Sequence, residues 1–191
     1  MPEYLRTWDA WRDIHQPFEL DWWKDAMRKG HSIIYDEPFE NSWREVREWI
    51  QPHGTVIDIG CGPRPPFTPC TVIEPLADEY RKLTPASWWN GVTVHAQPAE
   101  QQIAGLKGDT IICWNAIDHA IGWREIMDSM VAYCREHSKL AIATDFWPPF
   151  DGHPGFDRSD FMSEVHKRFN VHDTREPFGR RTFAMLLTKK S

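Results

Sequence analysis

The hydrophobic pattern of the chain changes near residue 52. Before that point apolar residues recur at helical spacing, most clearly in the stripe Trp43, Val46, Trp49 and Ile50. Ser42 and Glu45 have the form of a capping box at the start of this helix, and Pro52 predicts its end. We therefore expect residues 1–50 to form an N-terminal helical cover and residues 51–191 to form a second domain.

After residue 52, short β-rich runs alternate with helical segments. Strands are predicted at 55–59, 70–74, 91–96, 109–114 and 139–145, and helices at 75–83, 123–137 and 157–168. This alternation is typical of a parallel sheet. The chain ends with "NVHDTRE", "PFG" and "RTFAMLLTKK", which predict two strands that pair antiparallel across a short loop. The pattern favours an α/β, Rossmann-like fold with a mostly parallel seven-stranded sheet, a C-terminal antiparallel hairpin and an N-terminal helical cover.

Composition narrows the range of partners. The formal net charge is −6, and no basic run is longer than a pair such as Arg180-Arg181 or Lys189-Lys190, so a nucleic-acid surface is disfavoured. No apolar run is long enough to span a bilayer, and "MPEYLRTWDAW" lacks the core of a signal peptide. The four cysteines form no CxxC pair, which disfavours a zinc site or a disulfide framework. We expect a reduced, cytoplasmic protein with no metal and no membrane partner.

The segment "TVIDIGCGPRPPFTPCTVIEPL", residues 55–76, predicts a nucleotide-binding unit. Its first strand ends at Gly60-Cys61-Gly62 and its second at Glu74, and parallel sheets bind ligands at these carboxyl ends. A carboxylate there can accept both hydroxyls of a ribose. A dinucleotide would need a third glycine and a helix N-terminus for its pyrophosphate, but Pro65 stands at the glycine position. An adenosine without phosphate, such as S-adenosylmethionine, makes no such demand.

The connection between these two strands is unusual. Residues 63–69 contain four prolines, which cannot form an ordinary helix, and about ten residues are near the lower limit for a parallel crossover. We predict an extended or irregular segment with at most one helical turn. The missing helix would leave one sheet face uncovered, and we expect N-terminal aromatic side chains to cover it.

Four motifs in order resemble the class I S-adenosylmethionine-dependent methyltransferases. They are "VIDIGCGP", "VIEPLADEYRKL", "VHAQPAEQ" and "DTIICWNAIDHAIGWREIMDSM". They resemble, respectively, the glycine-rich motif, the ribose-binding acid, the adenine-side loop, and the fourth strand with the residues after it. The "[DE]-P-L" and "N-x-[LI]-D-H" forms are similar to those of the methyltransferase type 11-like subgroup. The resemblance covers residues 55–188 and implies S-adenosylmethionine as the cofactor.

The resemblance also implies roles for individual residues. The methionine part of the cofactor would lie on Asp58 and on the backbone of Gly60, Cys61 and Gly62. Glu74 would hold the ribose, with Pro75 next to it, and Leu76 would pack on adenine. The loop formed by Gln97, Pro98, Ala99 and Glu100 would face the adenine edge, and Asn115 would lie beneath the cofactor. Two features depart from the family pattern: Pro98 stands where relatives often carry an acid, and "REHSKL" replaces a Gly-Gly turn.

Candidate catalytic residues follow the fourth strand. His119, with Asp118 beside it, is the best candidate for a general base, because its ordinary pKa suits proton transfer near neutral pH. The alternative is that this pair caps the next helix or closes the cofactor pocket. His153 is a second candidate. Glu100 has an alternative role as a carboxylate near a helix N-terminus.

Aromatic residues define a possible acceptor pocket. Trp22 or Trp23 would form one wall, and Trp147 and Phe150 the other, which suggests a planar or apolar small-molecule acceptor. The alternative for the N-terminal tryptophans is packing within the helical cover. The sequence thus favours a methyltransferase acting on a small molecule. The alternatives are a cofactor-binding protein without catalysis, a methyltransferase acting on a macromolecule, and a protein that binds a different nucleotide.

Overall fold

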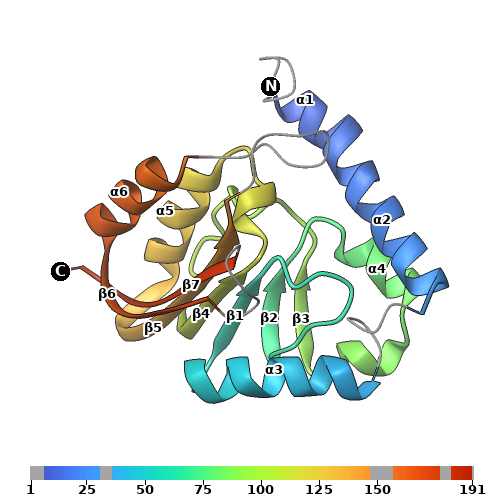
Figure 1. Ribbon diagram of the computed structural model, residues 1–191, viewed down its shortest axis with the longest axis horizontal. Coiled ribbons are helices and arrows are strands. Elements are labelled where there is room, and N and C mark those ends of the chain that lie inside the picture. Colours follow the sequence, from blue (N-terminus) through green and yellow to red (C-terminus); the bar gives the residue numbers. More distant parts are fainter. Residues whose placement is uncertain (1–6, 31–35, 147–156, 177–181, 191) are drawn as a thin grey trace.

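Seven strands form one sheet in the computed structural model, which describes residues 7–30, 36–146, 157–176 and 182–190 (Figure 1). The strands are β1 (Val56–Ile59), β2 (Cys70–Ile73), β3 (Val92–His95), β4 (Gly108–Trp114), β5 (Cys134–Asp145), β6 (Phe169–Arg175) and β7 (Thr182–Lys189). Their order is β3-β2-β1-β4-β5-β7-β6. Strands β1 to β5 pair parallel, and β7 pairs antiparallel with β5 and β6. The predicted sheet with its C-terminal hairpin is confirmed.

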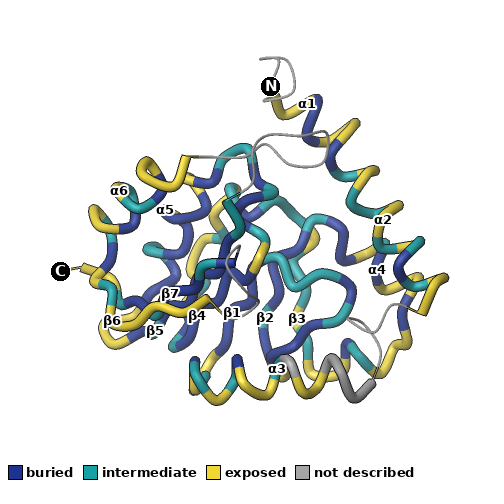
Figure 2. The backbone as a smooth tube through the Cα atoms, in the orientation of Figure 1, coloured by how far each residue is buried: buried dark blue, intermediate teal, exposed yellow. Residues whose placement is uncertain are grey.

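Helices pack on both faces of the sheet and along its carboxyl edge (Figure 1). They are α1 (Trp8–Ala10), the π-helical turn η2 (Trp11–His15), α2 (Gln16–Arg28), α3 (Asp36–Ile50), α4 (Ala77–Leu83), α5 (Trp123–Tyr133) and α6 (Arg158–Arg168), with 3-10 turns η3 (Ala86–Trp89) and η4 (Ile117–His119). Figure 2 shows the central strands buried and the outer sides of α2 and α3 exposed. Within the described residues, none of the helices combines the length and apolarity needed to cross a membrane.

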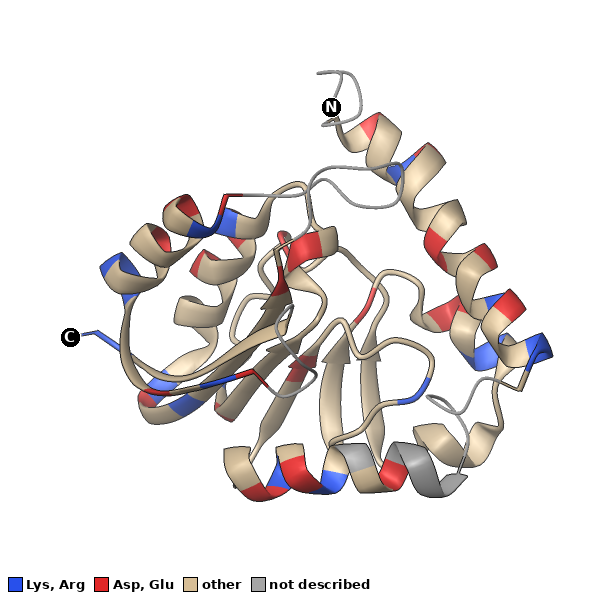
Figure 3. Ribbon diagram, in the orientation of Figure 1, with Lys and Arg blue, Asp and Glu red and all other residues tan. Residues whose placement is uncertain are grey.

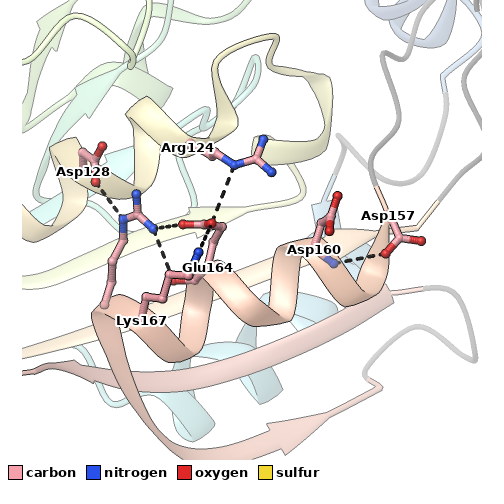
Figure 4. A network of polar contacts seen from close by, with 7 residues as sticks. Arg124, Asp128, Asp157, Asp160, Glu164 and Lys167 are labelled. Atoms are coloured by element: carbon pink, nitrogen blue, oxygen red, sulfur yellow. Dashed lines mark hydrogen bonds and ion pairs between the residues drawn. The ribbon is translucent and has the colours of Figure 1, made fainter.

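One sheet face is covered by α5 and α6. Their apolar residues, including Met127, Met130 and Phe161, pack in one cluster with Ile57 and Ile111 of the central strands. The helices are also joined at the surface by a polar network around Glu164, which contacts Arg124, Lys167 and Arg168 (Figure 4). Hydrogen bonds from Lys167 and Arg168 lower the pKa of Glu164 to about 2. The network connects α5 to α6, and we assign it a structural role.

The opposite face is covered by α3, the helix that precedes β1 in the chain. Val46 and Ile50 are buried against β1, β2 and β4, and Trp43 and Trp49 pack beside them. The expectation that N-terminal aromatic side chains cover this face is confirmed for these two tryptophans. The helix start predicted at Ser42 is wrong: α3 begins at Asp36 and continues through Ser42, so the Ser-x-x-Glu pattern lies inside the helix. The predicted end is right, because α3 stops at Ile50, two residues before Pro52.

The proline-rich connection between β1 and β2 contains no helix, as predicted. Its side chains occupy the space where a crossover helix would pack. Phe67 is 4% exposed and meets the Trp43 ring edge-on, with ring centroids 5.3 Å apart. Arg47 of α3 donates a hydrogen bond to the Pro66 carbonyl (2.9 Å), and Glu40 forms ion pairs with Arg47 and Arg64 (both 2.9 Å). The connection is therefore tied to α3 by one aromatic contact and a small polar network.

The segment before β5 differs from its predicted structure. The helix expected over 123–137 ends at Tyr133, and β5 begins at Cys134. The cause is Ser138, whose hydroxyl accepts the Arg135 amide (2.7 Å) and donates to the Gly108 carbonyl (2.6 Å). These bonds hold residues 134–138 against the start of β4.

Replacing Phe67 tests how much the β1–β2 connection stabilises the protein by packing on the sheet face. Phe67→Ala should lower the free energy of unfolding by about 3–5 kcal/mol, because a buried aromatic ring is lost and a cavity is left. Urea denaturation measures this value. Leu83→Ala is the matched control, since Leu83 is 42% exposed and its loss should have a small effect. Equal, small losses for both variants would show that the connection does not support the sheet.

Candidate active site

A cavity of about 610 Å³ lies at the carboxyl edge of the sheet, where the strand order reverses between β1 and β4. Four segments contribute to its wall: the end of β1, the end of β2, the loop after β3, and the residues after β4. The fifth part of the wall is the helical segment 11–23, which contributes Trp11, Gln16, Glu19 and Trp23. Open parallel sheets bind ligands at this position, and the volume is in the range of small-molecule sites.

The glycine-rich segment after β1 approaches the cavity with its backbone. Gly60 and Gly62 have φ values of 72° and 63°, in the left-handed region that favours glycine. A Cβ atom on Gly60 would lie 2.2 Å from the Cβ of Ala116, so the turn also packs tightly on the segment after β4. Cys61 lines the cavity between them. The turn therefore exposes backbone rather than side chains to a ligand.

Glu74 is the most buried acidic residue that lines the cavity. It is 6% exposed, and its carboxylate accepts the Leu76 amide (3.0 Å) and the Gly62 amide (3.3 Å). Burial raises its pKa to about 7; the Leu76 bond opposes this shift and the nearby Glu19 charge adds to it. A carboxylate has about four acceptor sites, so Glu74 keeps acceptor capacity for ligand hydroxyls.

Asp58 lies behind this wall, within β1. It is 1% exposed and does not line the cavity, and one of its oxygens has no hydrogen-bond partner among the described residues. Burial, and secondarily the charge of Glu74, raises its pKa to about 8. Because Glu74 and Asp58 are both buried and close enough to interact, ionisation of one disfavours ionisation of the other. A ligand that brings hydroxyl donors or a positive charge would therefore suit this part of the protein.

The loop after β3 is partly directed to the cavity. Pro98, Ala99 and Glu100 line it, whereas Gln97 turns away and donates to the Gln101 carbonyl (2.7 Å). Glu100 accepts the amide of Gly122, the residue that precedes α5 (3.3 Å), and burial raises its pKa. The alternative role of Glu100 near a helix N-terminus thus applies to α5, and no helix begins at Glu100 itself.

The residues after β4 form the floor. Asn115 has a φ of 53°, which is uncommon for a residue other than glycine, and it lines the cavity. His119 follows on η4: its Nδ1 lies 3.6 Å from Glu19 Oε2, and its Nε2 lies 3.9 Å from Asp118 Oδ2. Asp118 is buried behind it. Neither side chain caps α5, whose capping residue is Gly122 with no side-chain hydrogen bond.

The segment 11–23 forms a roof, of which the sequence analysis assigned only Trp22 or Trp23 to the site, and Trp23 is the one that lines the cavity. Trp23 lies close to Gly62, since a Cβ there would be 3.6 Å from its ring. Trp11, Gln16, Glu19 and Trp23 are spaced by 5, 3 and 4 residues. The interval of five residues, from Trp11 to Gln16, spans the π-helical turn η2. The wider turn places Trp11 on the same face of the helix as the three later residues. Helical spacing of Gln16, Glu19 and Trp23 was the available signal, but nothing local indicated that this face lies over the carboxyl edge.

Other predicted acceptor residues have different positions. Trp22 is 46% exposed, does not line the cavity, and packs edge-on against Trp23. Trp147, Phe150 and His153 lie outside the described residues. Additional cavity residues are Trp43, Arg64, Tyr80, Trp114 and Thr182, which the sequence reasoning had not assigned to it. No group of three or more potential metal ligands occurs within the described ranges.

Sequence comparison identified no related family. A scan against family models gave no match, and no curated protein matches the sequence.

Solved structures do match, and all of the following are methyltransferases. N-methyltransferase NodS from Bradyrhizobium japonicum WM9, in complex with S-adenosyl-L-homocysteine, has a TM-score of 0.64 at 14% identity, over 82% of this chain and 90% of that chain. The 1,6-didemethyltoxoflavin-N1-methyltransferase of Burkholderia thailandensis, with 1,6-didemethyltoxoflavin and S-adenosylhomocysteine bound, has a TM-score of 0.64 at 13% identity, over 90% and 87%. The glycopeptide N-methyltransferase MtfA with sinefungin has a TM-score of 0.63 at 12% identity, over 80% and 87%. These likenesses confirm the Rossmann-like methyltransferase fold.

The buried carboxyls of the cavity should make stability depend on pH in a defined direction. The pKa of Glu74 in the folded protein is about 7, above the ordinary value of 4.5, so the folded state holds this proton more tightly than the unfolded state. The associated stability is present below about pH 4.5 and is lost as the pH rises through about 7. Glu74→Gln should therefore stabilise the unliganded protein relative to the parent more at pH 8.5 than at pH 5.5.

Urea denaturation at the two pH values tests this sign. Glu136→Gln is the charge-matched control, because Glu136 has an 88% exposed side chain and removing its charge should not change the slope with pH. A Glu74→Gln variant that loses stability relative to the parent as the pH rises would contradict the account of a buried, protonated carboxyl.

Proposed function

We propose that the protein is an S-adenosylmethionine-dependent methyltransferase that acts on a small molecule. The observation that carries this proposal is the position of Glu74: a buried carboxylate with remaining acceptor capacity, at the end of β2, next to the exposed backbone of Gly60–Gly62. The methyltransferases cited above have a similar fold, and this similarity of architecture supports the proposal. The resemblance of the four sequence motifs supports it independently.

The residues present fit this cofactor. Glu74 would accept the two ribose hydroxyls, and Leu76, which is buried beside it, would pack on the adenine ring. Pro98 and Ala99 would face the adenine edge, although Pro98 offers no N–H donor. Asp58 does not line the cavity, so the amino group would lie on the backbone of Gly60–Gly62, and Asp58 would act on it only through the charge of a buried carboxyl group. Glu74 is thus the residue we propose for the ribose hydroxyls of the molecule.

The bound cofactor would supply an electrophilic methyl group on a positively charged sulfur. The chain's own contribution is to hold the acceptor in line with that group and to exclude water. The roof residues Trp11 and Trp23 are placed to exclude water, since both line the cavity from the N-terminal helix. His119 is placed to take a proton from the acceptor, directly or through Glu19, because it lies on the cavity wall between Glu19 and Asp118.

A cofactor-binding protein without catalysis is the second candidate. The short connection after β1 favours it, because the helix that normally follows the glycine turn is absent. Against it, His119 and Glu19 line the same cavity 3.6 Å apart, which gives the site a candidate for the proton transfer that only catalysis needs. We therefore place this candidate second.

Calorimetry with S-adenosylmethionine tests the cofactor assignment. The parent should bind in the micromolar range or tighter, and Glu74→Ala should weaken binding about tenfold or more, because hydrogen bonds to a charged group contribute about 1.5–3 kcal/mol. Asp78→Ala is a suitable control, since Asp78 is an exposed carboxylate on the next helix, α4. An unchanged dissociation constant in folded Glu74→Ala would remove Glu74 from the site, and no binding to the parent would end the proposal.

Turnover of His119→Ala separates a methyltransferase from a binding protein. With an acceptor found in a pool of small metabolites, the rate of S-adenosylhomocysteine release should fall by about 10²–10⁴-fold, with little change in cofactor affinity. His137→Ala, at a side chain that is 91% exposed, is the control. If turnover persists while cofactor affinity falls, His119 belongs to the pocket wall and is not the base.

A further inference from the structure

The wall of the cavity carries more acidic than basic side chains. Glu19, Glu74 and Glu100 line it, and Arg64 is the one lysine or arginine among its described residues. Arg64 forms an ion pair with Glu40 (2.9 Å), and its guanidinium lies over the Trp88 ring, 4.7 Å from the centroid. Its charge is therefore largely compensated by its neighbours. Figure 3 shows acidic positions on α2 and on the segments at the carboxyl edge that faces it.

Glu19 differs from the other two carboxylates in its partners. Glu74 and Glu100 accept backbone amides of the protein, whereas Glu19 is held only by side chains among its described contacts. Its Oε1 accepts the indole N–H of Trp23 (2.6 Å), and its Oε2 lies 3.6 Å from His119 Nδ1. These contacts aim the carboxylate from the roof toward the floor. Glu74 lines the same cavity, and the charge of Glu19 raises its pKa.

Aromatic rings line the same cavity as this carboxylate. Trp23 donates its indole N–H to Glu19, and Trp11, Trp43, Trp114 and Tyr80 lie elsewhere on the cavity wall. A carboxylate next to indole rings is the combination that binds an organic ammonium: the carboxylate accepts its N–H groups, and the ring faces attract the positive charge. The same wall opposes a carboxylate acceptor, because its charge would face Glu19 and Glu74 with no free cation on the described wall.

We infer that Glu19 recognises a protonated amine on the methyl acceptor, and that the acceptor is an aromatic or apolar small-molecule amine. This inference rests on the proposed function for the transfer step, but the recognition of the amine can be measured without it. His119 lies 3.6 Å from Glu19 and could act as the base that such an acceptor needs. An ammonium nitrogen has no lone pair, so it must first lose one proton, which His119 takes and later releases to water. The nitrogen lone pair then forms the new N–C bond as the S–C bond breaks, and the sulfur keeps that electron pair.

The test compares three ligands of one shape that differ in charge. Tryptamine, tryptophol and indole-3-acetic acid present a cation, a neutral hydroxyl and an anion, and phenethylamine, 2-phenylethanol and phenylacetic acid repeat the series with a smaller ring. Calorimetry on the full chain, with and without S-adenosylhomocysteine, should give the tightest binding for the amine and the weakest for the acid. Glu19→Gln should weaken amine binding about 10- to 100-fold, because a charge-assisted bond becomes a neutral one.

Controls separate recognition from general effects. Glu19→Gln retains an oxygen that can accept the Trp23 N–H, so the fold of α2 and the affinity for the alcohols should be unchanged. Glu19→Asp keeps the charge on a shorter side chain and should retain part of the amine preference. Glu136→Gln removes an exposed charge of the same sign and should leave amine binding at the parent value.

The outcomes are distinct. Alcohols or acids that bind as tightly as the amines, amine binding that survives Glu19→Gln, or no binding of either amine at millimolar concentration would each overturn the inference. If S-adenosylmethionine does not bind to the parent, the proposed function fails, and the amine preference of the unliganded chain still decides the role of Glu19.

Discussion

Ten residues, 60–69, connect two neighbouring parallel strands, β1 and β2, and four of them are prolines. A connection of this length and composition has no room for a helix of normal length. The apolar face of β1, β2 and β4 must therefore be covered by another part of the chain, and α3 provides that cover from the N-terminal side of the sequence. Phe67 turns inward to meet Trp43, and Arg47 binds the Pro66 carbonyl. The connection, α3 and the sheet are thus mutually dependent.

The same constraint shapes the cavity. Without a helix after Gly62, the glycine turn has no helix N-terminus of its own for a phosphate, and buried carboxylates lie beside it instead. Glu74 and Asp58 are held in surroundings that raise their pKa values, to about 7 and about 8, mainly because both are buried. Burying carboxyl groups without compensation is unfavourable, so hydroxyl donors and positive charge from a ligand would relieve the cost. Glu19 extends this character from the strand ends to the roof.

Much of the fold could be predicted because its signals are local. Alternating β-rich and helical runs gave the order of the strands in the chain, and prolines 63, 65, 66 and 69 excluded the crossover helix. The segments that line the cavity were also predictable, since strand ends of a parallel sheet converge. Local signals failed where tertiary contacts decide. The capping-box pattern at Ser42 and Glu45 lies inside α3, and the end of α5 depends on Ser138 bonding to a distant strand.

The roof shows why part of the site could not be predicted. Trp22 or Trp23 was expected in the acceptor pocket, but Glu19, one turn before Trp23, was not, because its proximity to His119 arises from the packing of α2 against α4 and the glycine turn. No periodicity along one helix reports which edge of a sheet it will lie over. Trp22 and Trp23 are adjacent in the sequence and equivalent in residue type, yet one lines the cavity and the other is 46% exposed.

The most direct test of the central claim is a crystal structure of the full chain with S-adenosylhomocysteine. The account predicts that both ribose hydroxyls lie within hydrogen-bond distance of Glu74, that the homocysteine part lies along Gly60–Gly62, and that the sulfur faces the space between Glu19 and His119. A ligand that occupies the cavity without contacting Glu74, or one bound elsewhere on the protein, would contradict it.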